Sequence, residues 1–284
     1  MLTGTDIPIP DAFTGTDLDE LSATSAVTGD PRLAQAAEHA EQGQVSQYLA
    51  GGPALLERYR TALPAACALI DAAMDARRLG HGLRLPESLL EAAVRGYLTD
   101  SQWDGRGQDW LEQALAYTAK DCRGARGPLT IIQPSPGDPP PAGRYYRLAD
   151  YLEQHGRTRR LRPMPKALLD ALIADAAAED LARFGGQAEE QGLNQAAIRL
   201  YGAAAERGNT SVLLRLAWLL RSADRVEEAL TCCRRAIKAG DTSVEETMAD
   251  LLVQVGRAEE AIPLFQRVVE RGRNGYPIDA YCAP

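Results

Sequence analysis

The chain of 284 residues has little of the side-chain chemistry that enzymes and metal centres use. It contains three histidines and five cysteines, and none stands in a Cys-x-x-Cys or His-Glu-x-x-His spacing. The motif Gly-x-x-x-x-Gly-Lys-Ser/Thr does not occur either, so a triphosphate has no loop of the P-loop type to hold it. We therefore predict no catalytic residue, no cofactor and no metal site, and we expect the cysteines to be reduced thiols.

Long apolar runs are also missing. No stretch approaches the roughly 20 apolar residues that span a bilayer, and the opening MLTGTDIPIP has neither the basic start nor the apolar centre of a signal peptide. The 39 acidic residues outnumber the 31 basic ones, which disfavours indiscriminate attraction to nucleic acid or anionic membranes. With 45 % apolar residues the chain can bury cores, and we expect a folded cytoplasmic protein of bacterial type.

What the sequence does have is an internal repeat in its C-terminal third. Segments that start 32 residues apart, at Gly192, Asp224 and Gly256, align as GLNQAAIRLYGAAAERG, DRVEEALTCCRRAIKAG and GRAEEAIPLFQRVVERG. Small and large residues coincide at helical spacing, and each segment closes on a glycine suited to the left-handed end of a helix. The aligned columns are Ala197, Ala229 and Ala261; Tyr201, Cys233 and Phe265; and Gly208, Gly240 and Gly272.

The stretches between these segments are also expected to be helical. Leu213, Leu216, Ala217 and Leu220 form an i, i+3, i+4, i+7 stripe, and Thr242 to Glu245, TSVE, has the spacing of a capping box. Each unit is therefore predicted to be two antiparallel helices that bury their faces by stacking on the next pair. This pattern resembles the tetratricopeptide repeat, with a period of 32 instead of 34 and without the usual proline. We predict such helical repeats over residues 164–273 and a tail over 274–284.

The resemblance implies a concave face, lined by the first helix of each unit, that binds a protein or peptide. The family's inward positions fall on Arg183, Arg215, Trp218, Arg221, Glu246, Asp250 and Gln254. Arg215, Trp218 and Arg221 place one indole between two guanidiniums, which suits an acidic or aromatic segment. We take Arg183, Arg215, Trp218, Arg221 and Asp250 as candidate partner-binding residues. The alternative is that Trp218 packs on the next unit and the arginines are solvated.

The middle of the chain has a different organisation. Between about residues 60 and 156, three predicted helices precede two β-rich runs, 129–132 and 145–148, on either side of a loop rich in proline and glycine. This is the order of a winged helix. We assign residues 1–29 to an extended segment and 30–156 to a helical lid-like segment plus a winged-helix-like domain. The predicted fold class is all-α, with a small β-hairpin in the winged-helix-like domain and an α-solenoid of tetratricopeptide-like pairs after it.

A basic region near the wing offers a second hypothesis, that of a DNA-binding transcriptional regulator. Its candidate phosphate contacts are Arg144, Arg147, Arg157, Arg159, Arg160 and Arg162. The predicted recognition helix, 107–120, however carries Asp109 and Glu112 and has only Lys120 as a cation. Because an acidic face repels the phosphate backbone, DNA binding stays an alternative.

Several stretches, among them DWLEQALAYTAKDCRGARGPLT and YRLADYLEQHGR, resemble actinobacterial signalling NTPases of the STAND class. The resemblance covers the lid, the winged helix and the repeats that follow the P-loop core of that class, and it implies a sensor or scaffold. A Met-His-Asp motif contacts ADP in many of its members, and the matching residues here are Leu148, Ala149 and Asp150. The leading expectation is a non-catalytic interaction module with a protein or peptide partner. A DNA-binding regulator, or an enzyme on a helical scaffold acting on a small molecule, are the alternatives.

Overall fold

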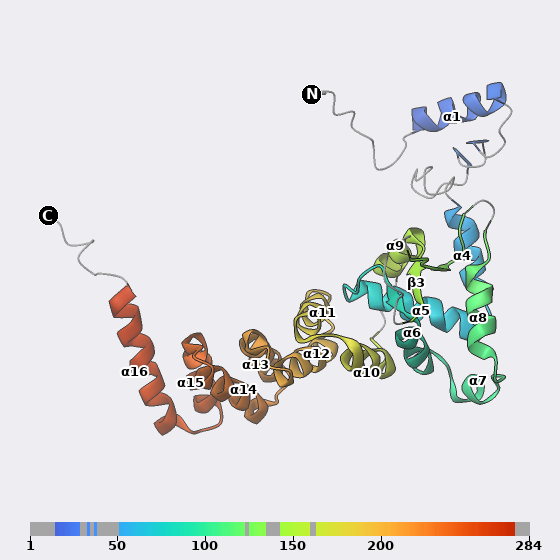
Figure 1. The fold of residues 1–284 in the computed structure, drawn as a ribbon. Coiled ribbons are helices and arrows are strands. Elements are labelled where there is room, and N and C mark those ends of the chain that lie inside the picture. The colour runs from blue at the N-terminus through green and yellow to red at the C-terminus, as the bar shows by residue number, and fades with distance from the viewer. Residues whose placement is uncertain are drawn as a thin grey trace. The chain divides into compact units, whose positions relative to one another are not determined.

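The structure is a computed structural model that describes residues 15–28, 33–34, 37–38, 51–122, 125–134, 143–159 and 163–275 (Figure 1). The chain forms two compact units. The first comprises Met1–Arg78 and Gly82–Arg162, and the second comprises Leu79–His81 and Pro163–Pro284. Helices dominate both units, and the described strands all lie in the first.

The first unit contains a three-stranded antiparallel sheet. Its strands are β1 (Leu85–Pro86), β2 (Leu129–Ile131) and β3 (Tyr145–Leu148), in the order β1-β3-β2. The predicted pairing of the two runs beside the wing is confirmed, with Leu129 opposite Leu148. The third strand, β1, was not expected, because two residues that end in proline give no alternating pattern.

The helices of the first unit alternate with these strands in the order of a winged helix. They are α1 (Gly15–Thr28), α4 (Gly52–Arg60), α5 (Pro64–Arg78), α6 (Glu87–Val94), the 3-10 turn η2 (Arg95–Tyr97), α7 (Asp100–Asp104), α8 (Trp110–Ala119) and α9 (Asp150–Arg159). Helix α5 is the core of the unit: Leu69, Ile70 and Met74 are fully buried, and the helix packs against α6, α8 and α9. Helix α1 lies inside the segment that was expected to be extended, and it begins with Asp17 in its first turn, where the helix dipole favours a carboxylate.

The second unit consists of stacked helix pairs, as the repeat predicts. After α10 (Lys166–Asp175) the pairs are α11 (Ala178–Glu190) with α12 (Asn194–Glu206), α13 (Leu213–Ser222) with α14 (Val226–Lys238), and α15 (Glu245–Gln254) with α16 (Ala258–Gly275). Helix α12 also contacts α13, and α14 contacts α15, so that successive pairs share their cores. The 3-10 turns η3 (Thr210–Val212) and η4 (Thr242–Val244) lead into α13 and α15.

The repeated phrases GNTSV and GDTSV build the turn between pairs. Gly208 and Gly240 have φ angles of 94° and 92°, in the left-handed region that glycine adopts at little cost. The next residue caps the 3-10 turn: the side chain of Asn209 accepts a hydrogen bond from the amide of Ser211 at 3.2 Å. Asp241 repeats this contact with Ser243 at 2.9 Å.

Two details of the predicted turns are wrong. Thr242 to Glu245 is not a capping box, because Asp241 is the cap and the Glu245 carboxylate binds arginines of α16 instead. Gly272 does not end a helix, since α16 continues to Gly275. The sequence explains this difference: arginine stands at position 273, where the two earlier turns have the capping residues Asn209 and Asp241.

Candidate functional site

Helix α13 carries the predicted row of arginine, tryptophan and arginine. The helix folds with Leu213, Leu216 and Leu220 in the core, and the 3.6-residue period then places the row on the other side. Trp218 is 47 % exposed, and the side chains of the two arginines are also about half exposed. Such a display of indole and guanidinium is the composition that protein-binding surfaces favour.

At one end of the row, Arg215 is linked to the preceding pair. Its Nε lies 3.3 Å from Oε2 of Glu189 in α11. The same carboxylate oxygen accepts a hydrogen bond from the hydroxyl of Tyr201 at 3.0 Å. Burial, with the bond to Glu189 and its charge, raises the pKa of Tyr201 to about 12. Glu189 therefore accepts a hydrogen bond from the neutral Tyr201 phenol and forms an ion pair with Arg215 at the same time.

At the other end, Trp218 and Arg221 face the following pair. The indole Nε1 of Trp218 donates to Oγ1 of Thr247 at 3.2 Å, and Nη1 of Arg221 lies 3.9 Å from Oδ2 of Asp250. Trp218 thus packs on the next helix pair, as the alternative interpretation holds, yet nearly half of its surface stays exposed. The structure places four of the candidates on the first helices of two successive pairs: Arg215, Trp218 and Arg221 on α13, and Asp250 on α15.

An open depression of about 790 Å³ adjoins this row. Its lining comes from three helices: Arg221 and Ser222 of α13, Asp250, Val253 and Gln254 of α15, and Phe265 of α16. Val253 and Phe265 are 51 % and 37 % exposed, so apolar surface lies beside one charge of each sign. The depression can take an apolar side chain while its rim engages polar or charged groups.

Phe265 was not among the predicted site residues. Its repeat column suggests burial, and the matching Tyr201 and Cys233 are indeed 5 % and 0 % exposed. Tyr201 packs beside Gly185 of α11 in its own pair, and the helices that carry Tyr201 and Cys233 also contact the first helix of the following pair. Within the residues described here, α16 has no such following pair, which leaves Phe265 partly exposed.

Arg183 differs from the other candidates. Its guanidinium donates to the carbonyl of Gly80, pairs with Asp180 of the same helix, and lies 4.9 Å from the ring centroid of Phe184. His81 stacks on that ring with centroids 5.9 Å apart. Arg183 therefore anchors the segment Leu79–His81 on α11, and the structure does not bring it together with the α13 row.

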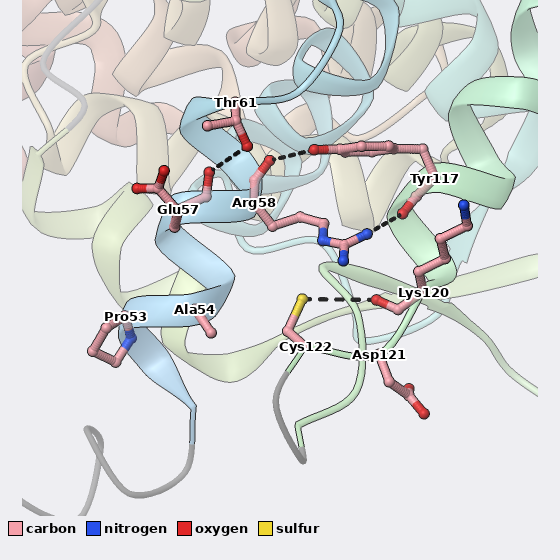
Figure 2. A pocket seen from close by; sticks show the side chains of 9 residues that line it. All are labelled: Pro53, Ala54, Glu57, Arg58, Thr61, Tyr117, Lys120, Asp121 and Cys122. Atoms are coloured by element: carbon pink, nitrogen blue, oxygen red, sulfur yellow. Dashed lines mark hydrogen bonds between the residues drawn. The ribbon is translucent and has the colours of Figure 1, made fainter.

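A second pocket, of about 660 Å³, lies in the first unit between α4 and the end of α8 (Figure 2). Arg58 and Tyr117 bond reciprocally across it: Nη1 of Arg58 donates to the carbonyl of Tyr117 at 3.4 Å, and the Tyr117 hydroxyl donates to the carbonyl of Arg58 at 3.0 Å. The thiol of Cys122 donates to the carbonyl of Lys120 at 3.7 Å. These bonds hold the α4–α8 contact together, so the pocket walls have a structural role.

Three of the six candidate phosphate contacts are paired with carboxylates. Arg144 binds Glu87 at 2.8 Å, Arg147 binds Asp150 at 3.1 Å, and Arg157 binds Glu153 at 2.8 Å. The side chain of Arg159 and the whole of Arg160 and Arg162 lie outside the described residues. Asp109 and Glu112 are exposed at the start of α8, which keeps the predicted recognition helix acidic.

The remaining reactive side chains have structural surroundings. Burial raises the pKa of the Cys232 thiol, and burial together with the neighbouring Cys232 raises that of Cys233 to about 12. The ring of His155 lies 6.3 Å from that of Tyr59, and His39 falls outside the described part of the chain. In the described ranges, no group of three or more histidine, cysteine or acidic side chains is arranged to hold a metal ion.

The comparisons with known proteins give no family: no family model, no curated protein and no solved structure matches the chain. Among the helices described, none combines the length and apolarity needed to cross a membrane.

Proposed function

We propose that the second unit is a non-catalytic protein-interaction module, a sensor or scaffold, that binds a protein or peptide along the first helices of its pairs. The observation that carries the proposal is the exposed row on α13 beside the depression lined by Arg221, Asp250, Val253 and Phe265. Tryptophan and arginine are the residues most enriched among energetic hot spots of interfaces. Here three of them lie within seven residues of one helix.

The ion pairs of the row are weak enough to be exchanged. The Arg215–Glu189 and Arg221–Asp250 pairs have distances of 3.3 and 3.9 Å, and both arginines are about half exposed. Exposed pairs of this kind contribute about 0 to 1 kcal/mol. A carboxylate on a partner therefore replaces the internal partner at little cost, whereas Arg183, bonded to a backbone carbonyl and stacked on Phe184, is less available.

The depression suggests the chemistry of the bound segment. Val253 and Phe265 offer apolar contact, while Arg221, Asp250, Ser222 and Gln254 offer donors and acceptors on the rim. A peptide with one apolar or aromatic side chain and a nearby carboxylate satisfies both features, with the carboxylate directed to Arg221 and Arg215. Trp218, between the two arginines, then contacts the peptide backbone or an aromatic side chain.

We also propose that the chain corresponds to the lid, winged-helix and repeat portion of a STAND-class protein without its P-loop core. The order of a winged helix followed by stacked helix pairs supports this assignment. The residues that match the ADP-sensing motif end β3 and begin α9, and Asp150 lies in the first turn of α9. Ala149 has no imidazole to contact a nucleotide, so ADP titrated into the protein is expected to give no saturable heat.

The interaction proposal is tested by affinity capture from a bacterial lysate with three forms of the protein. The first is the wild type, and the second replaces Arg215, Trp218 and Arg221 by alanine. The third is a matched control, Thr231→Ala with Arg234→Ala and Lys238→Ala on α14, which also removes two positive charges from exposed positions of the same pair.

We expect a specific protein to be retained by the wild type and the control and to be lost with the α13 variant, with or without nuclease. Retention by all three forms would remove the α13 row from the proposal. If the captured proteins are lost on nuclease treatment but are retained equally by the wild type and the α13 variant, the DNA-binding alternative is favoured instead.

A further inference from the structure

Helix α16 has an apolar stripe on its outer side. Ile262, Phe265 and Val269 stand at i, i+3 and i+7 and are 55 %, 37 % and 54 % exposed. Three such residues on one helical face form a continuous apolar seam. Single exposed apolar residues are ordinary, whereas an aligned set marks a contact surface.

The internal repeat identifies what such a stripe packs against. The residues 64 positions earlier, on α12, are Ile198, Tyr201 and Ala205, and they are 5 %, 5 % and 1 % exposed. Helix α13 and its leading turn η3 both contact α12. The same relation recurs at the next junction.

At that next junction, the residues 32 positions before the stripe are Leu230, Cys233 and Ile237 of α14. Leu230 and Cys233 are fully buried, and Ile237 is partly buried. Here α15 and η4 contact α14. Both earlier stripes therefore lie on helices that contact a 3-10 turn followed by an amphipathic helix.

We propose that the α16 stripe is a docking site for an amphipathic helix of a partner protein that takes the place of the next first helix. Continuity supports this occupant: the stripe extends the seam along which α13 and α15 already pack, and it has the same spacing. Helices α13 and α15 also indicate which apolar pattern the partner helix needs. In α15 the buried apolar positions are Ala249, Leu251 and Leu252, after Val244 of the turn.

This site is distinct from the α13 row in what it recognises. The row offers guanidiniums and an indole to a polar segment, whereas the stripe offers an aliphatic and aromatic seam to a helix. The two surfaces share Phe265, which also lines the depression. Ile262 and Val269 do not line the depression, so substitutions at these two positions test the stripe alone.

The chain supplies a suitable probe, because its own residues 241–255, DTSVEETMADLLVQV, form the turn and helix that cover α14. A fluorescent synthetic peptide of this sequence is titrated with the full-length protein, and a scrambled peptide of the same composition is the negative control. The test variant is Ile262→Asp with Val269→Asp. The control variant is Leu63→Asp, a 70 % exposed apolar residue of the first unit.

We expect saturable anisotropy with the wild type and the Leu63→Asp control, no response from the scrambled peptide, and affinity about tenfold or more weaker with the α16 variant. Circular dichroism is expected to give the same helix content for all proteins, since both altered side chains are more than half exposed. If the helix content of the α16 variant falls, the affinity of the peptide is measured instead for Ile262→Ser, which adds no charge to the stripe.

Three results would overturn the proposal. The first is no saturable binding, or binding that the α16 variants leave unchanged. The second is a wild-type dimer in sedimentation experiments that these variants dissociate, which would show that a second copy covers the stripe. The third is peptide binding that appears only after residues 276–284 are removed, which would assign the stripe to the chain itself.

Discussion

Glu245 is the most informative residue for testing how the last helix pair is held together. It is 3 % exposed, and its Oε1 accepts a hydrogen bond from Nε of Arg267 at 2.7 Å. Its Oε2 binds Nη2 of Arg271, whose Nη1 donates to the carbonyl of Thr242 at 3.0 Å. The matching residue of the preceding pair is Leu213, fully buried, so this pair replaces an apolar contact by a buried carboxylate.

The substitution Glu245→Gln keeps the size of the side chain and removes its charge. One of the two acceptor oxygens is then replaced by an amide NH2, which cannot accept from an arginine. One charge-assisted hydrogen bond, worth about 1.5 to 3 kcal/mol, is lost, and the other loses the carboxylate charge. The arginine side chains are about half exposed and remain hydrated after the change. We therefore expect the free energy of opening the α15–α16 pair to fall by about 2 to 3 kcal/mol at pH 7.

The effect has a defined pH dependence. Burial alone would raise the pKa of Glu245, but the hydrogen bonds and charges of Arg267 and Arg271 together lower it. A carboxyl with a lowered pKa stabilises the folded state fully above its unfolded pKa, about 4.3. That contribution is lost as the pH falls through the folded pKa. Wild type and Glu245→Gln are therefore expected to converge in acid.

Native-state hydrogen exchange is the assay, because it reports the opening of α15 and α16 separately from the first unit. The matched control is Glu246→Gln, one residue further along and exposed, which is expected to change stability by about 0.5 kcal/mol or less. Equal losses in the two variants, or a loss at Glu245 that does not shrink at low pH, would refute the role assigned to this ion triad.

Three further predictions concern the same unit. Gly185→Ala is expected to lower stability by about 1 kcal/mol or more, because the new Cβ would lie 2.6 Å from Cδ1 of Tyr201. Gly186→Ala makes only an ordinary contact at 3.6 Å and is not expected to lower stability. Thermal unfolding of the two variants compares these effects. The thiols of Cys232 and Cys233, buried and with raised pKa values, are expected to resist a thiol reagent at pH 8 until urea is added, whereas immediate labelling would contradict their burial. Ultraviolet titration is expected to show one phenol ionising at lower pH after Glu189→Ala than in the wild type, because the hydrogen bond and charge of Glu189 add to burial in raising the pKa of Tyr201 to about 12. Identical titrations would contradict that link.

Much of the fold could be predicted from the sequence, because it depends on short-range periodicity. The 32-residue register predicts the helix pairs and the glycines at their turns, and Gly208 and Gly240 have the required left-handed conformation. The two runs beside the wing pair as expected. Strand β1 was missed because its pairing with β3 joins Leu85 to Tyr146, a contact that no local pattern records.

The interactions of charged residues were harder to predict. Periodicity shows which face a residue occupies and not which partner it meets, so the pairing of Glu245 with Arg267 was not foreseen. The ion pair of Asp75 and Arg78, at 2.9 Å inside the core of α5, is a similar case. Among the site candidates, repeat positions put Arg221 and Asp250 on the same expected face without pairing them, and the structure places them 3.9 Å apart. The repeat gave no sign that Arg183 is bonded to Gly80.

The proposed partner-binding face is tested most directly by covalent capture. A photo-crosslinking amino acid replaces Trp218 in one protein and Thr231, an exposed position of α14, in another. Both are irradiated in cell extract, and the crosslinked products are identified by mass spectrometry. We expect one protein, joined through a defined peptide, at position 218 and not at position 231. The same products at both positions, or none at 218, would contradict the proposal.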